Sequence, residues 1–462
     1  MSDFETVLDA VRERVDPTPA ERRALAEAAE RLADRARDAI AELPVEADVM
    51  QVGSTARGTW VAGDRDIDLF VRFPPDLPRE ELQEYGLEIG NGVLPEGREE
   101  YAEHPYVKGT FEGYDVDLVP CYRLESATDI QSAVDRTPFH NAYLEARLSE
   151  ADAGDVRLFK QFLKGIGAYG SDLRTQGFSG YLTELLVLEY GGFRETLDAI
   201  RGWQPPVVLD PEDHAEAEFD DPLVVVDPTD PERNVAAVVS AENVARVQHY
   251  VREFLADPDE SVFEPTTPDP LGAEAVREYV AERGTTPLAV VFEAPDLVED
   301  QLYPQLYRSR DGLVRGLEIG GFEVLRAATW AEDRAVLFAE LSVSELPEVE
   351  RHEGPPVHVG GHAQGFYEKY ADSDAAGPFL DGDRYVVERE RAVTTAREFV
   401  ETQLEDVALG AHVESIVEAG DYEVLAGEAV SELADGFGVE LAAYFEPSVA
   451  SASVRTRSAS RP

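Results

Sequence analysis

The chain has 462 residues, of which 94 are acidic and 41 basic, so its formal net charge is −53. At roughly 100–200 residues per domain, this length predicts two to four domains. No run approaches the ~20 apolar residues of a membrane helix, and the single cysteine, Cys121, excludes an intrachain disulfide. We therefore expect a protein of the reducing cytoplasm with no membrane partner, in which Cys121 fills the core.

The distribution of charge bears on whether the partner is a nucleic acid. So acidic a chain ordinarily argues against one, because phosphate binding depends on cationic patches. Here the acid is spread over every segment and lysine is nearly absent, which resembles proteins of a salt-loaded cytoplasm, where electrostatic screening is strong. The alternative is an acidic interaction protein.

The first predicted elements lead to a pair of acids. Apolar residues recur at helical spacing from Asp3 to Leu43, which predicts one helix ended by Pro44. The stretch from Val52 to Phe73 then ends in a strand where Asp66 and Asp68 alternate with aliphatic residues. Residues two apart in a strand share a face, so both carboxylates point to the same side.

A second strand with acids is predicted from Gly113 to Tyr122, where Asp115 and Asp117 share a face. Neighbouring carboxylates repel each other unless a cation lies between them, and their hard oxygen atoms suit Mg²⁺. Pairing of the two strands would let Asp117 complete a three-carboxylate magnesium site. A helix from Pro78 to Val93 and a strand from Tyr106 to Phe111 between them indicate a mixed sheet with helices behind it.

Gly53 and Ser54 precede the first acid strand. A glycine lets backbone N–H groups approach a ligand closely, and a hydroxyl at the start of a helix adds to a phosphate cradle. Phosphates at one end and metal ions at the other describe a nucleoside triphosphate site.

The middle of the chain predicts helices and one buried strand. His140 is expected just before a helix. The segment from Asp155 to Gly170 predicts a helix with Arg157, Lys160 and Lys164 on one face. The alternative to a binding role for these cations is a stripe of salt bridges along that face. The other predictions are an apolar helix from Phe178 to Tyr190, a buried strand from Leu223 to Val226, and a turn from Asp230 to Asn234 leading into a helix.

The stretch from Pro265 to Pro287 is a composition break and predicts a domain boundary. A strand, a helix and two strands follow, an order that suggests an RNA-recognition-like α+β unit without its stacking aromatic residues. The His358 to His362 segment is expected to be a loop, and Ala392 to Phe445 to be largely helical. A tRNA contact is expected between Gly365 and Tyr385, from Phe366, Tyr367, Lys369, Tyr370 and Arg384.

Seven segments in order carry a family resemblance: VGSTARGTW, DIDLFVRFP, VDLVPCY, VDRTPFH, LFKQFLK, GFSGYLTELL and ERNVAAVVS. Together they resemble the archaeal (class I) CCA-adding enzymes, tRNA nucleotidyltransferases of the polymerase β-type superfamily. The resemblance implies an α+β fold: a nucleotidyltransferase domain with a mixed sheet in residues 1–150 and a central helical nucleotide-binding domain in 151–263. A C-terminal α+β tRNA-binding region would occupy residues 264–450, and a disordered tail 451–462.

The resemblance also implies an activity, the addition of CCA to tRNA that lacks its 3′ CCA, from CTP and ATP with Mg²⁺ as cofactor. Asp66, Asp68 and Asp117 would be the catalytic metal ligands. The implied nucleotide-binding residues are Gly53, Ser54, Arg57, His140, Lys160, Tyr169, Arg233 and Asn234. Among them, Ser54 and Arg57 would hold phosphates, Lys160 and Tyr169 would reach the triphosphate and sugar, and Arg233 would read the base edge.

Several alternatives stay open at this point. His140 is more often a structural residue in such a position, and Asn234 equally well caps a helix. A poly(A) polymerase shares the acid and Gly-Ser pattern, and use of CTP separates it from a CCA-adding enzyme. A noncatalytic RNA-binding protein is a third hypothesis, which intact acids disfavour. The sequence leaves the oligomeric state, including a homodimer, undetermined.

Overall fold

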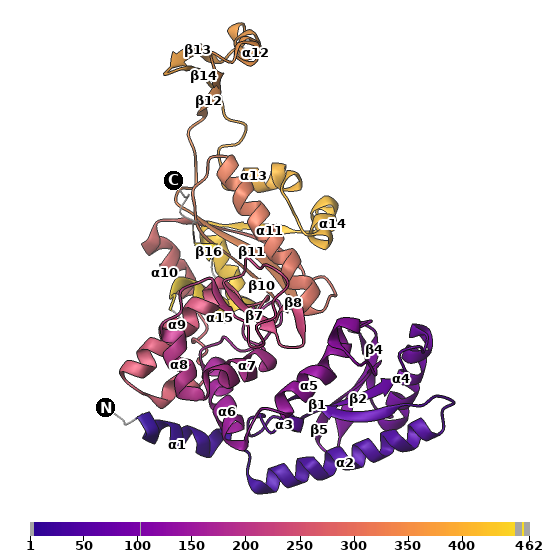
Figure 1. Ribbon diagram of the computed structural model, residues 1–462. Helices are drawn as coiled ribbons and strands as arrows, with labels where there is room; N and C mark the ends of the chain where they lie inside the picture. Colours follow the sequence, from indigo (N-terminus) through magenta and orange to yellow (C-terminus); the bar gives the residue numbers. More distant parts are fainter. Residues whose placement is uncertain (1–3, 102, 449–454, 457–462) are drawn as a thin grey trace. The chain divides into compact units, whose positions relative to one another are not determined.

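The computed structural model describes residues 4–101, 103–448 and 455–456, and it divides into two compact units, Met1–Thr266 and Thr267–Pro462. This division lies within the composition break that begins at Pro265. The finer division at residues 150 and 263 stays a prediction. Each unit is described by itself below (Figure 1).

The first unit contains a five-stranded mixed sheet of order β1-β2-β5-β4-β3. Only β2 and β5 are parallel to each other, and the other neighbours are antiparallel. The strands are β1 (Asp48–Val52), β2 (Asp66–Phe73), β3 (Arg98–Tyr101), β4 (Pro105–Phe111) and β5 (Tyr114–Tyr122). The predicted mixed sheet is confirmed, and β3 is an additional strand.

Helices α2 (Pro19–Ala41) and α4 (Arg79–Val93) cover one face of this sheet. The aliphatic residues of β2, such as Ile67 and Leu69, are fully buried and pack with Leu32 of α2 and Ile89 of α4. The alternating acids of β2 therefore lie on the opposite face of the strand. Cys121 is buried, as predicted.

The prediction of one N-terminal helix is wrong. The chain forms α1 (Phe4–Val15) and α2, because Pro17 interrupts the first helix and Thr18 caps the second. Thr18 and Glu21 form a capping box, in which each side chain accepts a hydrogen bond from the other residue's backbone N–H. This signature was present in the sequence.

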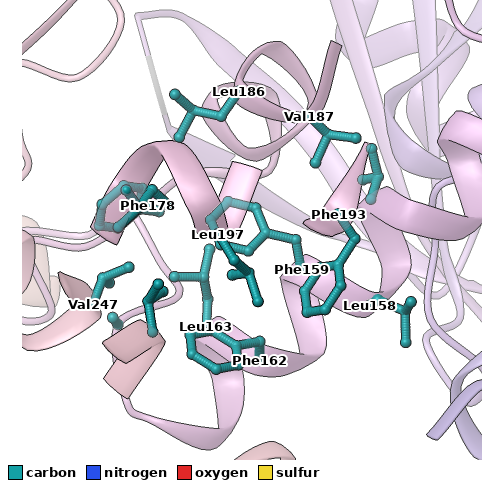
Figure 2. Close-up of a cluster of buried hydrophobic side chains, with 14 of the residues drawn as sticks. Leu158, Phe159, Phe162, Leu163, Phe178, Leu186, Val187, Phe193, Leu197 and Val247 are labelled. Atoms are coloured by element: carbon teal, nitrogen blue, oxygen red, sulfur yellow. The ribbon is translucent and has the colours of Figure 1, made fainter. Parts of the chain in front are cut away.

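Helices build the rest of the first unit around an aromatic core. They are α3 (Gly53–Arg57), α5 (Thr137–Glu145), α6 (Glu150–Gly165), α7 (Gly180–Tyr190), α8 (Phe193–Arg201) and α9 (Ala241–Ala256). Figure 2 shows Phe159 and Phe162 of α6 beside Phe193 and Leu197 of α8, all of them almost fully buried. This core holds α6 and α7 together, which positions their polar residues.

A small three-stranded sheet of order β6-β7-β8 completes this unit; its strands are β6 (Val207–Leu209), β7 (Leu223–Asp227) and β8 (Asp230–Asn234). The buried strand predicted from Leu223 is confirmed. Two expectations are wrong: Asp230–Asn234 is a strand paired with β7 rather than a turn leading into a helix, and His140 lies inside α5 rather than before a helix.

The second unit contains a five-stranded sheet of order β15-β9-β11-β10-β16. The predicted order of strand, helix and two strands is confirmed by β9 (Thr286–Glu293), α11 (Glu299–Ile319), β10 (Val324–Ala331) and β11 (Arg334–Leu341). Alternate residues of β11 pack into two different hydrophobic cores: Leu337 packs with α11, and Phe338 packs with α15 (Ala434–Phe445). The remaining elements are α10 (Ala273–Arg283), α13 (Ala396–Gln403), α14 (Ala411–Ala419), β15 (Glu423–Ala426) and β16 (Arg455–Thr456).

A second small sheet, β12 (Val349–Pro356), β14 (Arg384–Glu390) and β13 (Ala376–Asp381), packs with α12 (Gly360–Ala371). The loop expectation for His358 to His362 is wrong in part, because α12 begins at Gly360. Among the aromatic residues expected to contact tRNA, Tyr370 is buried and Tyr367 is exposed.

Two C-terminal expectations remain. The stretch from Ala392 to Phe445 is largely helical as predicted, with the strand β15 as an exception. The expected disorder of residues 451–462 lies outside the described residues, apart from Arg455–Thr456, which pair with β10. None of the helices described here is long and apolar enough to cross a membrane.

Candidate active site

The parallel register of β2 and β5 places the predicted acids opposite one another. Asp68 is the Cα partner of Asp117, and Asp66 is the partner of Asp115. Because the β2 and β5 side chains alternate in phase, these four carboxylates share the polar face of the sheet. The register therefore brings Asp66, Asp68 and Asp117 together, as the two predicted strands required.

The charges on this face are only partly compensated. Burial, together with the negative charges of Asp117 and Asp66, raises the pKa of Asp68 to about 6. Burial and the neighbouring carboxylates Asp64 and Asp115 likewise raise the pKa of Asp66. One cation, Lys108 of β4, lies 3.2 Å from Oδ1 of Asp117. The face thus favours binding of a further cation.

Two observations bear on whether these residues fit magnesium. Oδ1 of Asp117 is buried and, apart from its ion pair with Lys108, has no hydrogen-bond partner in the described part of the chain, and every ligand atom of the set is a hard carboxylate oxygen. The residues therefore fit Mg²⁺ in donor type. Among residues 4–101, 103–448 and 455–456, however, no three acid, histidine or cysteine side chains are gathered to hold an ion as they stand. The three-carboxylate site stays a prediction.

Gly53 opens α3 directly against the acid face. Its φ of +79° lies in the left-handed region, and a Cβ added there would overlap Oδ2 of Asp68. Only glycine meets both conditions without strain. Gly53 is therefore required for the close approach of the Gly53–Arg57 turn to the acids.

Arg57, expected to hold phosphates, is bound to a carboxylate that the sequence analysis did not identify. Its Nε and Nη2 donate to Oε1 and Oε2 of Glu184 at 3.2 and 2.7 Å, and its Nη1 donates to Oδ1 of Asn141 at 2.6 Å. Glu184 lies on α7 with its side chain fully buried, and Thr59 Oγ1 also donates to it. Burial alone would raise the pKa of Glu184, but the charges of Arg57 and Lys160 lower it.

Lys160 is buried beside this pair on α6. Burial lowers its pKa, whereas the charge of Glu184 opposes that change. Its Nζ and Oη of Tyr169 both lie near Gly180, where an added Cβ would be 3.7 and 3.2 Å from them. The structure therefore brings Lys160 and Tyr169 together, although their contacts with a nucleotide stay a prediction.

The other two cations predicted on this face of α6, Arg157 and Lys164, form ion pairs with carboxylates. Arg157 Nε lies 2.6 Å from Asp16 Oδ1, and Lys164 Nζ lies 3.2 Å from Asp64 Oδ1. No carboxylate of the described residues lies within ion-pair distance of Lys160. The salt-bridge alternative thus holds for Arg157 and Lys164.

His140 and Arg233 meet on a second buried acid, Asp227 at the end of β7. His140 Nε2 and Arg233 Nη1 each lie 2.7 Å from Oδ2 of Asp227. The His140 ring also stacks on Tyr181, with a centroid distance of 3.9 Å and an interplanar angle of 15°. Two predicted nucleotide-binding residues from different elements are thus joined by one carboxylate.

Asn234 uses its side chain to connect β8 with β7. Its Oδ1 accepts hydrogen bonds from the backbone N–H groups of Val225 and Ala236, both at 2.9 Å. Its Nδ2 donates to Asp221 Oδ2 and to the carbonyl of Leu223. The helix-cap alternative is therefore wrong, and a nucleotide contact by Asn234 stays a prediction.

Glu184 and Asp227 were missed by the reasoning from sequence. Each carried a signal, because Glu184 is a charged residue inside an apolar helix and Asp227 ends the apolar run LVVVD. A charge in such a position is costly unless it is paired. A search for acids within apolar runs would have found both residues.

Comparison with known proteins gives three family matches along the chain. Residues 33–140 match the nucleotidyltransferase domain, residues 154–264 the second domain of tRNA nucleotidyltransferase, and residues 283–427 the C-terminal domain of CCA-adding enzyme. A solved structure of Cid1 poly(U) polymerase with Mg 3′-dATP is 15% identical with a TM-score of 0.44, covering 57% of this chain and 99% of that chain.

Curated relatives cover nearly the whole chain. The CCA-adding enzyme of Halobacterium salinarum is 68% identical over 97% of this chain and 100% of its own length. That of Halorubrum lacusprofundi is 63% identical with the same coverage, and that of Methanosarcina acetivorans is 42% identical over 92% of this chain and 95% of its own. The chain therefore belongs to the CCA-adding enzyme family.

Proposed function

We propose that the protein adds CMP, CMP and AMP in turn to the 3′ end of tRNA that lacks its CCA, using CTP and ATP in the cytoplasm. The observation that carries this proposal is the 68% identity to a CCA-adding enzyme over 97% of the chain. The acid face supports a nucleotidyl transfer, because Asp68 and Asp117 lie in register beside the Gly53 turn.

In each step the 3′ oxygen of the tRNA attacks the α-phosphorus of the nucleotide. A new P–O bond forms, the bond to the β-phosphate breaks, pyrophosphate leaves, and the hydroxyl proton is lost to solvent. Asp66, Asp68 and Asp117 are the residues that would hold magnesium. When bound, magnesium would favour loss of that proton and neutralise the pyrophosphate.

The remaining polar residues would bind the nucleotide. Arg57 and Lys160 are the cations whose charges lower the pKa of Glu184, and we assign them, with Ser54, to the triphosphate. Tyr169 lies beside Lys160 and would contact the sugar. His140 and Arg233 would contact the base end of the nucleotide.

The test is an addition assay in molar KCl with tRNA that lacks its 3′ CCA and one labelled nucleotide at a time. We expect CTP alone to extend the tRNA by two residues, and ATP to add one residue only after CTP. A long adenosine tail made from ATP alone would instead indicate a poly(A) polymerase. Absence of transfer by the wild type, with tRNA still bound, would indicate a noncatalytic RNA-binding protein.

A further inference from the structure

Asp227 holds two groups of the proposed nucleotide site from inside the protein. Its side chain is completely buried at the end of β7. Oδ1 accepts hydrogen bonds from the backbone N–H of Thr229 at 2.9 Å and from its hydroxyl at 2.8 Å. Oδ2 accepts from His140 and Arg233, both at 2.7 Å. All contacts of this carboxylate thus come from donors.

This environment keeps Asp227 ionised. Burial alone would raise its pKa, but the hydrogen bonds from His140 and Thr229, together with the charge of Arg233, lower it. An ionised carboxylate can only accept hydrogen bonds. Nε2 of His140 must therefore carry the proton that it shares with Oδ2.

The tautomer of His140 follows from this contact. In a neutral imidazole, one nitrogen carries the proton and the other has a free lone pair. With the proton on Nε2, Nδ1 is a hydrogen-bond acceptor. Nδ1 makes no hydrogen bond with the described residues, and stacking on Tyr181 fixes the plane of the ring. An oriented acceptor is thus left for another molecule.

We propose that Asp227 is a positioning residue that fixes Nδ1 of His140 as an acceptor for a donor group of the incoming nucleotide, with Arg233 held as a donor beside it. The inference rests on the proposed function, which supplies the nucleotide. Two donor groups have the required chemistry: the exocyclic amine that cytosine and adenine share and that uracil lacks, and a ribose hydroxyl.

The test is Asp227→Asn, which keeps an oxygen for Thr229 and turns an amide N–H₂ toward both His140 and Arg233, so that Nη1 of Arg233 loses its acceptor. Nε2 must then accept, so the proton moves to Nδ1 and the acceptor becomes a donor. Nitrogen-15 NMR of labelled histidine, at a pH where the ring is neutral, should show Nε2–H in the wild type and Nδ1–H in the variant. The tautomer of the wild type is measurable even where the variant does not fold.

Steady-state kinetics with different nucleotides identify which donor group of the nucleotide Nδ1 of His140 accepts from. If the acceptor reads the amine, kcat/KM for CTP and dCTP should fall about 10- to 100-fold, while that for UTP changes little. If it reads the ribose hydroxyl, CTP and UTP should fall together and dCTP should be spared. Either selective pattern supports the inference when the NMR also shows the change of tautomer. A merely structural role would lower all three equally, and a displaced Arg233 alone would leave the tautomer of His140 unchanged.

Asp230→Asn is the matched control. Asp230 lies on the neighbouring strand and accepts hydrogen bonds from Arg136 at 3.2 and 3.1 Å. Its replacement should change neither the tautomer of His140 nor the ratios among CTP, UTP and dCTP. The inference is overturned by Nδ1–H in the wild type, or by an equal loss for all three nucleotides in Asp227→Asn. A wild type that transfers no nucleotide would overturn the proposed function and leave the tautomer result standing.

Discussion

Glu184→Gln tests the buried charge cluster that underlies the proposed triphosphate site. Glu184 is fully buried, and the side chain of Arg57 is only 8% exposed. Glutamine keeps the shape but removes the negative charge, and its amide group faces donors of Arg57 and Thr59. Breaking a buried ion pair by removing one partner costs about 3–5 kcal/mol, because the other charge stays buried without compensation.

This loss of stability should be measurable by thermal unfolding. At roughly 2 °C or more per kcal/mol, the melting temperature of the first unit should fall by at least about 6 °C in calorimetry at fixed molar KCl. The matched control is Asp64→Asn, which removes a partly exposed partner of Lys164 and should cost no more than about 1 kcal/mol. A Glu184→Gln protein as stable as this control would refute the reasoning.

A double-mutant cycle isolates the pair. If Arg57 has already been replaced by methionine, removing the charge of Glu184 leaves one uncompensated buried cation fewer than the same change does in the wild type. The double variant should therefore lose about 1–3 kcal/mol less than the two single variants together. The nucleotide gives a second readout, because CTP would bring negative charge to the unpaired cations. CTP should raise the melting temperature more in Glu184→Gln than in the wild type, and an equal rise would argue against a triphosphate at Arg57.

Three further predictions concern the acids, the base and the solvent. Gly53→Ala should reduce transfer about 100-fold, since the added Cβ displaces Asp68, whereas Gly63→Ala, whose Cβ would meet nothing within 4 Å, should keep most activity. Arg233→Ala should lower kcat/KM for CTP and ATP toward that for UTP, a loss of roughly 1–3 kcal/mol of discrimination; an equal loss for all nucleotides would contradict a role in base selection. Activity and melting temperature should both rise from about 0.1 M to molar KCl, because screening at molar salt shortens the repulsion of a −53 chain to about 3 Å; a steady fall of both above about 0.2 M would contradict the high-salt interpretation.

Local patterning was sufficient to predict the elements that carry the acids. The period-two alternation around Asp66, Asp68 and Asp117 predicts strands with polar faces, because alternation depends only on neighbouring residues. The order of strand, helix and two strands in the second unit followed from the same kind of signal. The break at Pro17 was also local, and reading the capping box that follows it would have corrected the N-terminal helix.

Partners across the fold could not be read from local patterns. The parallel register that sets Asp68 opposite Asp117 depends on how the chain crosses over between β2 and β5. Asp230–Asn234 resembled a turn, yet pairing with β7 makes it a strand, because hydrogen bonds to a neighbouring strand override weak local preference.

The buried acids show the same division most clearly. From the sequence, Glu184 and Asp227 are single charges within or after apolar runs, and elementary electrostatics requires each to have a partner. The partners are distant: Arg57 is 127 residues from Glu184, and His140 is 87 residues from Asp227. The sequence by itself determined that these charges must be compensated, whereas only the tertiary structure decided by which residues, because burial brings together side chains that no local interaction relates.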